Sequence, residues 1–478
     1  MTVGDTDFGL QVGIGFVGRV VMAVFAFAGS IVLGRILGPD GYGMFYFLMA
    51  IVLFAHNPIN GWATACRKRL TESEFPSGEA IGATVLGIAV GTAITLMSAF
   101  LLSPIITRHT DNPDSWVYLT VLLVGIISFT ASLQILKATK HFGTSTWVEA
   151  ARDIVRVLLQ GGLVIGGFGV AGMVGGITAA NLLIVPMVFY LIGARPTVPS
   201  KESLLAIWEF ARSSIPSGLV GIAQNRMDVL LLGFLVGTEV VGNYEIALKM
   251  TMPAMFVAGV AQSGLMGRIS NLRSKGEPIV RDIQNNLNYA SIIGIPLFFG
   301  ALTMAEPLVV TIYSNKFAGA APFLIGLALF RLLRTQKAIL VATINGLDRP
   351  EINLRISIVV FSVNIGIGVT LLYIIGPLGI VVATIMSELL AYGIRAYYVD
   401  SMMPNLSLIT RPVYEQLASG VVMAIVVYTA RQALPIRFWP MVIVVVGIGG
   451  LTYFAMLIII SKSFSTTIKS IITSLDYG

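Results

Sequence analysis

Residues 33–45 read LGRILGPDGYGMF and decide the fold, because residues 232–244, LGFLVGTEVVGNY, repeat their pattern 199 positions later. Three glycines match in register: Gly34 with Gly233, Gly38 with Gly237, and Gly43 with Gly242. Each stretch follows an apolar run that holds an arginine, Arg19 before the first and Arg226 before the second. An internal repeat in an apolar chain is typical of two related lobes around a shared cavity. We therefore expect the functional site where the two lobes meet.

The composition predicts a membrane protein. Of the 478 residues, 56% are hydrophobic and 12% are charged, and the mean hydropathy is +0.86. In a soluble domain about a quarter of the residues are charged. Stretches of about 20 mostly apolar residues, the length that spans a bilayer, recur from Val12 almost to the C-terminus. The single cysteine, Cys66, and the scattered histidines indicate no disulfide and no metal site. We expect an all-α integral membrane protein without metal or cofactor.

Apolar stretches broken by glycine, proline or charge clusters number about fourteen. The predicted spans are residues 12–33, 42–62, 80–102, 116–136, 146–168, 170–192, 215–236, 240–265, 287–308, 320–344, 352–375, 378–398, 414–434 and 439–460. GVAG at 169–172 and GPLG at 376–379 extend the repeat to the sixth and twelfth spans. We therefore expect an N-terminal six-helix lobe over 1–195, a C-terminal six-helix lobe over 200–400, and two additional transmembrane helices with a cytoplasmic tail over 410–478.

The distribution of Lys and Arg predicts the orientation, because cytoplasmic loops carry the excess. With the N-terminus inside, eighteen basic residues fall in cytoplasmic segments: Arg67, Lys68, Arg69, Lys137, Lys140, Arg195, Lys201, Arg212, Arg268, Arg273, Lys275, Arg281, Arg349, Arg355, Arg395, Arg411, Lys462 and Lys469. Five fall in outer segments: Arg35, Arg108, Lys316, Arg431 and Arg437. We expect both termini to be cytoplasmic, and the glycosylation sequon at Asn405 to be silent in a cytoplasmic loop.

Thirteen ionisable residues remain inside the predicted spans, and they carry a net positive charge. The basic ones are Arg19, Arg152, Arg156, Arg226, Lys249, Arg331, Arg334 and Lys337, and the acidic ones are Glu149, Asp153, Asp228, Glu245 and Glu388. A charge at the bilayer centre costs at least about 2.5 kcal/mol, so such residues face a protein interior or a wet cavity. We expect most of them to point away from lipid.

The fifth span holds a charged helix face. Glu149, Arg152, Asp153 and Arg156 follow the i, i+3, i+4, i+7 spacing of one face, so they can pair within the span. Such pairing would be structural, yet intramembrane charges also mark transport pathways. Both interpretations stay open for Glu149 and Asp153, and for Asp228. Structural pairing is favoured for Glu245 and Lys249.

The basic residues of the seventh and tenth spans indicate an anionic ligand. No acid lies three or four positions from Arg226 or Arg331. The tenth span contains no acid, and its basic residues follow one another at three-residue intervals: Arg331, Arg334 and Lys337. The arginine fork matches phosphate geometry, so we expect a phosphate or pyrophosphate; alternatively, Arg334 and Lys337 extend to the headgroups. Glu388 is the one acid of the twelfth span, and either stays protonated or titrates in an ion-coupled cycle.

The echoed stretches carry a family resemblance. The first stretch, together with NRMDVLLLGFLVG at 225–237, the charged fifth span and INGLDRP at 344–350, resembles the polysaccharide transporter family. These are the Wzx-like lipid-linked oligosaccharide flippases of the multidrug/oligosaccharidyl-lipid/polysaccharide exporter superfamily. The resemblance implies two six-helix lobes in a V around a central cavity. It also implies a substrate, a polyprenyl- or dolichyl-(pyro)phosphate-linked saccharide moved from the cytoplasmic to the outer leaflet for cell-surface polysaccharide or protein glycosylation.

Joined to this resemblance, the basic residues give a mechanistic hypothesis. We expect alternating access in the cell membrane, with the substrate phosphate held by Arg19, Arg156, Arg226, Arg331 and Arg334. Expected partners are the lipid-linked saccharide, membrane lipid and glycosylation or polysaccharide assembly enzymes, with no nucleic acid. One alternative is a cation-coupled drug or metabolite antiporter of the same superfamily, and the net positive charge disfavours it. Another is a membrane-embedded glycosyltransferase or ligase, which the short outer loops disfavour.

Overall fold

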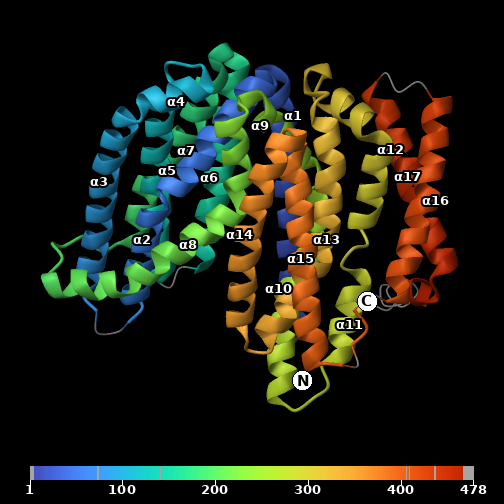
Figure 1. Cartoon of the computed structure of the whole chain (residues 1–478). Coiled ribbons are helices and arrows are strands. Elements are labelled where there is room, and N and C mark those ends of the chain that lie inside the picture. Colours follow the sequence, from blue (N-terminus) through green and yellow to red (C-terminus); the bar gives the residue numbers. More distant parts are fainter. Residues whose placement is uncertain are drawn as a thin grey trace. The chain divides into compact units, whose positions relative to one another are not determined.

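A computed structural model describes residues 5–72, 75–139, 142–404, 406–408, 410–434 and 438–466. The side chains of residues 5–23 and of Phe142 lie outside this description. Four residues named above also lie outside the described residues: the basic residues Lys140, Arg437 and Lys469, and the sequon residue Asn405. Within the described ranges the regular structure is helical, with no strand (Figure 1). The chain divides into two compact units, unit 1 up to Gly242 and unit 2 from Asn243 onward.

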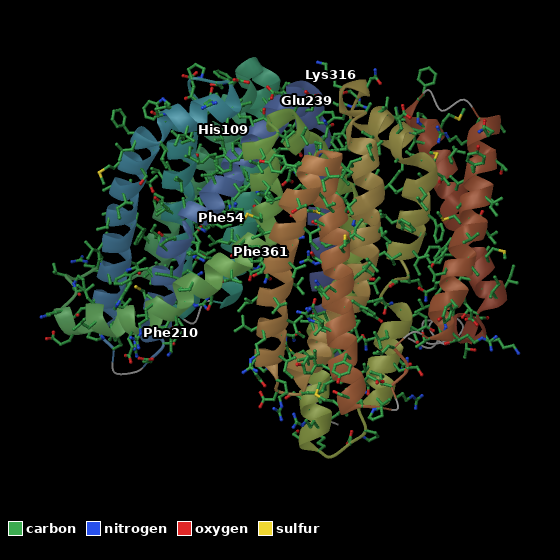
Figure 2. All side chains as sticks on the ribbon, in the orientation of Figure 1. Phe54, His109, Phe210, Glu239, Lys316 and Phe361 are labelled. Atoms are coloured by element: carbon green, nitrogen blue, oxygen red, sulfur yellow. The ribbon has the colours of Figure 1, made fainter. Side chains whose placement is uncertain are left out.

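Unit 1 consists of long helices and two short irregular pieces. Its elements are α1 (Asp5–Ala55), α2 (Asn57–Leu70), α3 (Ser77–Leu101), α4 (Ser103–Thr110), α5 (Ser115–Ala138), α6 (Phe142–Leu163), the π-helical turn η1 (Val164–Phe168), α7 (Gly169–Ile192), α8 (Lys201–Leu235) and the start of α9 (Thr238–Met250). Figure 2 shows His109 and Glu239 at one end of this unit and Phe210 at the other. Lys68 lies over the Phe210 ring at 4.5 Å, which places the basic end of α2 with Phe210.

Unit 2 contains the remaining helices. They are the rest of α9, η2 (Met252–Ala254), α10 (Met255–Ser274), α11 (Val280–Tyr289), α12 (Gly294–Ile312), η3 (Asn315–Phe317), α13 (Ala320–Gly346), α14 (Pro350–Ile375), α15 (Leu378–Met402), α16 (Arg411–Ala433) and α17 (Trp439–Ile460). The two C-terminal helices belong to this unit because α16 packs on α12. A Cβ atom added at Gly420 would lie 2.4 Å from the Phe299 ring, and Arg431 donates to the Thr303 carbonyl at 2.7 Å.

Ten helical stretches in the described residues are long and apolar enough to cross a bilayer. Two of these, Val24–Ala55 and Gly143–Ile192, each cover parts of two predicted spans, because the helix continues through a local break. The other two predicted spans correspond to α9 and α10, interrupted at 251–254, and to α13, which holds three basic residues. The all-helical membrane class is confirmed and the count of about fourteen agrees with these helices, whereas several boundaries were wrong. One example is α8, which begins at Lys201 rather than near 215.

The repeated stretches adopt the same backbone break. Gly38 has φ 69° and Gly237 has φ 140°, values that favour glycine because it lacks Cβ. A new helical segment begins directly after each, at Pro39 and at Thr238. Both stretches therefore form the breaks that the predicted span boundaries imply, and Gly43 and Gly242 lie inside the helices that follow.

The second pair of repeated motifs also forms equivalent turns. Gly169 and Gly376 have φ values of 54° and 73°. Three positions later the chain passes close to the helix it has just left: a Cβ at Gly172 would lie 3.0 Å from the Leu163 carbonyl carbon, and one at Gly379 would lie 2.3 Å from that of Leu371. Glycine is required at both places by this close approach. This second repeated motif therefore has the same backbone form in unit 1, at Gly169, and in unit 2, at Gly376.

The connection between the sixth and seventh predicted spans is packed within unit 1. Thr197 donates its backbone N–H to the Gly78 carbonyl at 2.9 Å, and Glu79 accepts from the Ser200 backbone N–H and hydroxyl at 2.8 and 2.7 Å. The Ser200 hydroxyl also caps α8 by accepting from the Ser203 backbone N–H. These contacts hold the start of α8 on unit 1. The predicted lobes over 1–195 and 200–400 stay a prediction.

The adjacent glycines of α7 give a matched test of helix packing. A Cβ at Gly176 would lie 2.6 and 2.7 Å from backbone atoms of Gln160, whereas the nearest atom to a Cβ at Gly175 is the Leu163 side chain at 3.8 Å. We predict that Gly176→Ala destabilises the purified protein by about 1–3 kcal/mol through overpacking. Gly175→Ala should leave Tm unchanged or raise it slightly, because alanine favours helix. Thermal unfolding in detergent measures both; equal Tm values for the two variants would contradict the close packing of α6 and α7.

Candidate functional site

Several of the ionisable residues predicted within the membrane lie in one cluster in each unit, together with Lys137 and Arg395, which were predicted in cytoplasmic segments. The unit-1 cluster consists of Lys137 on α5 and of Glu149, Arg152, Asp153 and Arg156 on α6. The unit-2 cluster consists of Arg331, Arg334 and Lys337 on α13 and of Glu388 and Arg395 on α15.

Asp153 lies at the centre of the unit-1 cluster. Its Oδ1 is 3.4 Å from Nη1 of Arg152 and 3.4 Å from Nη2 of Arg156. The pairing of Asp153 with Arg156 follows the helical spacing that the sequence predicts. Glu149 behaves differently, because it pairs with Lys137 of α5 at 2.7 Å rather than with its own helix. Across these pairs three basic residues share two acids, so the cluster keeps a net positive charge.

The two arginines of α6 retain unused donors. Arg152 lies over the Phe129 ring at 4.7 Å, a cation–π contact that fixes the plane of its guanidinium. Nε of Arg152 and Nε of Arg156 are buried and have no hydrogen-bond partner among the described residues. Buried guanidinium N–H groups without acceptors are costly. They are therefore suited to a ligand that brings acceptor oxygens.

Glu388 and Lys337 form an ion pair across α13 and α15. The Nζ–Oε1 distance is 2.6 Å, and the side chains of Lys337 and Glu388 are 18% and 8% exposed, respectively. Lys337 therefore turns inward to a carboxylate, and the alternative in which it extends to the headgroups is wrong for this residue. Glu388 of α15 therefore neutralises one of the three basic residues of α13. The sequence could not reveal this pair because its members lie on different helices.

Arg331 and Arg334 are the two guanidinium groups of α13. Both contact the ring of Phe330, at 5.7 and 5.5 Å from its centroid. Nε of Arg331 is buried without a hydrogen-bond partner among the described residues. The Phe330 ring thus contacts two neighbouring guanidinium groups. A guanidinium group can donate two parallel hydrogen bonds to a phosphate. The arrangement resembles the unit-1 cluster in chemistry but uses different helices.

Arg395 is a residue that the sequence reasoning misplaced. It was assigned to a cytoplasmic segment, but it lies inside α15 and is 4% exposed. Its guanidinium donates to Asn353 Oδ1 at 2.9 Å, to Ser357 Oγ at 3.0 Å and to the Ala391 carbonyl at 3.1 Å. Asn353 in turn donates to Asn345 at 2.8 Å, at the end of α13. Neutral acceptors from α14 satisfy this arginine, and its position within the predicted span was the signal that could have revealed it.

The remaining predicted site residues lie in known elements, although no geometry brings all of them together. Arg226 and Asp228 are half-buried in the second part of α8, in unit 1. Arg19 lies in α1, and its side chain is outside the described residues. Glu245, on the unit-2 part of α9, is 2% exposed. No group of three His, Cys, Asp or Glu side chains with metal-binding geometry occurs among the residues that the structure describes.

Comparisons with known proteins agree with the fold. Residues 32–322 match the family described as polysaccharide biosynthesis protein. The chain is 24% identical over 474 residues to the probable flippase AglR of Haloferax volcanii, covering 98% of this chain and 97% of AglR. It is 23% identical over 391 residues to the probable low-salt glycan biosynthesis flippase Agl15 of the same organism, covering 81% and 82%.

A solved structure shares the fold. The lipid II flippase MurJ in its inward closed conformation matches with a TM-score of 0.78 and 14% identity, covering 93% of this chain and 98% of MurJ. This likeness shows the architecture of the molecule, and the resemblance that the repeated stretches predicted is confirmed. Because the family model matches more than half of its residues, the chain belongs to the polysaccharide biosynthesis protein family.

Proposed function

We propose that this chain is a flippase that moves a polyprenyl- or dolichyl-(pyro)phosphate-linked saccharide from the cytoplasmic to the outer leaflet by alternating access. The observation that carries this proposal is the set of buried guanidinium donors without acceptors, at Arg152, Arg156 and Arg331. The relatives named as flippases, one of them a glycan biosynthesis flippase, support the substrate class. The reaction is a translocation, so no covalent bond is made or broken.

Phosphate is the chemical group that suits these donors. Guanidinium groups bind phosphate oxygens in pairs, and charge-assisted hydrogen bonds of this kind are roughly twice as strong as neutral ones. A site shielded from water strengthens them further. In the proposal, Arg156 and Arg226 of unit 1 and Arg331 and Arg334 of unit 2 bind the lipid phosphate, together with Arg19. The polyprenyl tail stays in the bilayer while the saccharide crosses.

The acids of the clusters take a structural role in this proposal. Glu149, Asp153 and Glu388 each belong to an ion pair, at 2.7, 3.4 and 2.6 Å respectively. Pairing offsets the cost of holding so many cations inside a membrane protein. Asp228, two positions from Arg226 on α8, is assigned the same role or a role in ion coupling. The protein thereby keeps an excess of basic groups for the ligand.

The proposed setting is the cell membrane, with both termini in the cytoplasm. The excess of Lys and Arg in alternate loops supports this orientation. Two six-helix lobes, 1–195 and 200–400, would rock about the substrate while the helices over 410–478 accompany the second lobe. Enzymes of polysaccharide assembly or protein glycosylation would supply the substrate on one face and use it on the other.

The drug or metabolite antiporter fits the charges less well. Such a protein binds cationic or neutral compounds, and a cavity of net positive charge repels cations. Among the described residues, Glu149, Asp153 and Glu388 are engaged with basic partners, so these acids of the two clusters are not free for glycosyl transfer. A phosphate-linked anionic lipid remains the substrate that its chemistry favours.

We predict that Arg331→Ala, and separately Arg226→Ala, lowers transfer of a labelled polyprenyl-pyrophosphate saccharide by at least about tenfold, the effect of losing about 1.4 kcal/mol of binding. Proteoliposomes that report outer-leaflet appearance of the label provide the measurement. Arg281→Ala, which removes an exposed arginine of α11, is the matched control and should transfer at the parent rate. Unchanged transfer by both Arg331→Ala and Arg226→Ala would refute the assigned phosphate-binding role.

A charge exchange tests the structural role of the Lys337–Glu388 pair. Removing one partner leaves a buried charge, and we expect Lys337→Gln or Glu388→Gln to cost about 3 kcal/mol of stability. The double variant Lys337→Glu/Glu388→Lys should recover part of the Tm because the pair is restored in reverse. Thermal unfolding of all three variants completes the cycle. Ion coupling would be indicated by a different result. In that case the Glu388→Gln protein unfolds at the same temperature as the parent, the transfer rate of the parent depends on pH, and the transfer rate of the variant does not.

A further inference from the structure

The first part of α8 precedes the predicted seventh span. That span covers residues 215–236, whereas α8 already begins at Lys201. Pro216 lies inside the helix and has no N–H to donate to the carbonyl of residue 212, so it marks a boundary between the two parts. Figure 1 shows the first part running across the lower ends of α2 and α3 rather than alongside these helices. We call residues 201–214 the end helix of unit 1.

One face of the end helix is packed on unit 1. Ile207 and Ala211 are fully buried in the core cluster that also contains Cys66 of α2. Arg69 of α2 donates from Nε and Nη2 to the Ala206 carbonyl, at 3.0 and 2.9 Å. These contacts fix the rotation of the end helix about its own axis, and therefore determine which of its residues face outward.

The outward side of the end helix carries a strip of basic and apolar residues. They follow the i, i+4, i+7, i+11 spacing of one face: Lys201, Leu205, Trp208 and Arg212. All four are exposed, and the apolar members are large: Leu205 is 59% and Trp208 is 52% exposed. Within the described part of the chain, no ion pair joins Lys201 or Arg212 to an acid. We call these four residues the basic–aromatic strip.

Acidic residues lie on a separate strip of the same helix. Glu202 and Glu209 are exposed and lie about a quarter of a turn from the basic–aromatic strip, at about 100° per residue. Glu209 has a basic partner on α2, because its Oε2 is 3.4 Å from Nη2 of Arg69. The end helix therefore separates its charges around its axis, with the basic residues beside tryptophan and leucine and the acidic residues away from them.

This arrangement matches a helix that lies in the interface between water and lipid. Trp is enriched where hydrocarbon meets headgroups, because its ring is apolar and its N–H is polar. Lys and Arg bury their aliphatic stems and extend their charge toward phosphate. Helices that combine such residues on one face lie in the plane of the interface. The acidic strip gives the end helix a side that favours water.

We infer that the end helix lies among the lipid headgroups and that its basic–aromatic strip binds anionic phospholipids. Lys201 and Arg212 contact the lipid phosphates, while Leu205 and Trp208 enter the upper acyl region. The strip selects anionic over zwitterionic lipid, by about fivefold for each basic residue near the surface. In the proposed orientation this is the cytoplasmic leaflet, because the basic end of α2 contacts Phe210 of the end helix. This lipid site is separate from the two clusters and is occupied without any translocation.

Spin labels measure the depth of each side of the end helix. Cys66 is the only cysteine, so Cys66→Ala provides a background for single cysteines. Trp208→Cys and Ser213→Cys are a matched pair, because both positions are exposed and lie about 140° apart on one helix. In nanodiscs we expect the label at 208 to collide with oxygen, which concentrates in lipid, and the label at 213 to collide with a water-soluble nickel chelate. Equal access of the chelate to both labels would place the strip in water and overturn the inference.

Quenching by labelled lipid measures the preference for anionic headgroups. A fluorophore attached to Trp208→Cys is quenched by phospholipids that carry a nitroxide near the headgroup end of the acyl chain. We expect the association constant of phosphatidylglycerol to exceed that of phosphatidylcholine by at least about fivefold. Lys201→Gln/Arg212→Gln should abolish this preference, and high salt should weaken it by screening.

A second pair of substitutions is the control. Lys275→Gln/Arg281→Gln removes two exposed basic residues of unit 2, one directly after α10 and one in α11. This variant should keep the parent's lipid preference at position 208. Both double variants should unfold at the parent's Tm, because all four substituted side chains are exposed.

The outcomes distinguish the occupants of the strip. Equal quenching by the two lipids in the parent, or a preference that survives Lys201→Gln/Arg212→Gln, would overturn the anionic-lipid site. A label at 208 that neither oxygen, nickel nor either lipid reaches would show that a protein surface covers the strip, which also overturns it. None of these measurements requires translocation, so they decide the lipid site whether or not the proposed flippase activity is found.

Discussion

A charged side chain inside a membrane protein needs a partner, and this constraint determines how the helices of both units pack. Lys137 pairs with Glu149 across α5 and α6, and Lys337 pairs with Glu388 across α13 and α15. Each pair joins two helices in an environment where the hydrophobic effect between helices is absent. Breaking one of these pairs would leave a charge that neither lipid nor neighbouring side chains can solvate. The ion pairs therefore fix the positions of α6 and α13, the helices that carry the arginines of the two clusters.

In each of the two clusters the basic residues outnumber the acidic ones. Arg152 and Arg156 share one aspartate, and Arg331 and Arg334 share the face of one phenylalanine ring. A chain selected for stability alone would have little reason to keep buried guanidinium donors without acceptors. A chain that binds a phosphate for a short time must keep them, since full internal pairing would leave nothing for the ligand. In the proposed flippase the same groups would cost stability and provide phosphate recognition.

The sequence predicted what depends on local pattern and missed what depends on helices meeting. Hydropathy and spacing gave the membrane class, the approximate number of spans, the turns of the repeat and the pairing of Asp153 with Arg156. The partner of Glu388 was not predictable, because it comes from α13 and no spacing rule links two helices. Arg395 was misplaced because its acceptors, Asn353 and Ser357, are neutral and lie on α14. The roles of the repeated glycines were not predictable for a similar reason. The φ values identify Gly38 and Gly237 as the turn residues, whereas Gly43 and Gly242 lie in close backbone contact across 199 residues of sequence.

Within unit 1, a Cβ at Gly43 would meet the Thr238 carbonyl and a Cβ at Gly242 would meet the Pro39 carbonyl. This reciprocal contact between the two repeated stretches has the symmetry that two identical subunits make in a homodimer. In a homodimer one codon specifies both sides, so every change is imposed twice. Within a single chain the two sides mutate independently, and here they have diverged: position 39 is proline, whereas its counterpart at 238 is threonine. Asp40 accepts a hydrogen bond from Thr238, but Glu239 can receive none from Pro39, because proline has no hydroxyl. The two sides of the contact therefore differ in their side chains, while both glycines allow the same close approach of the two backbones.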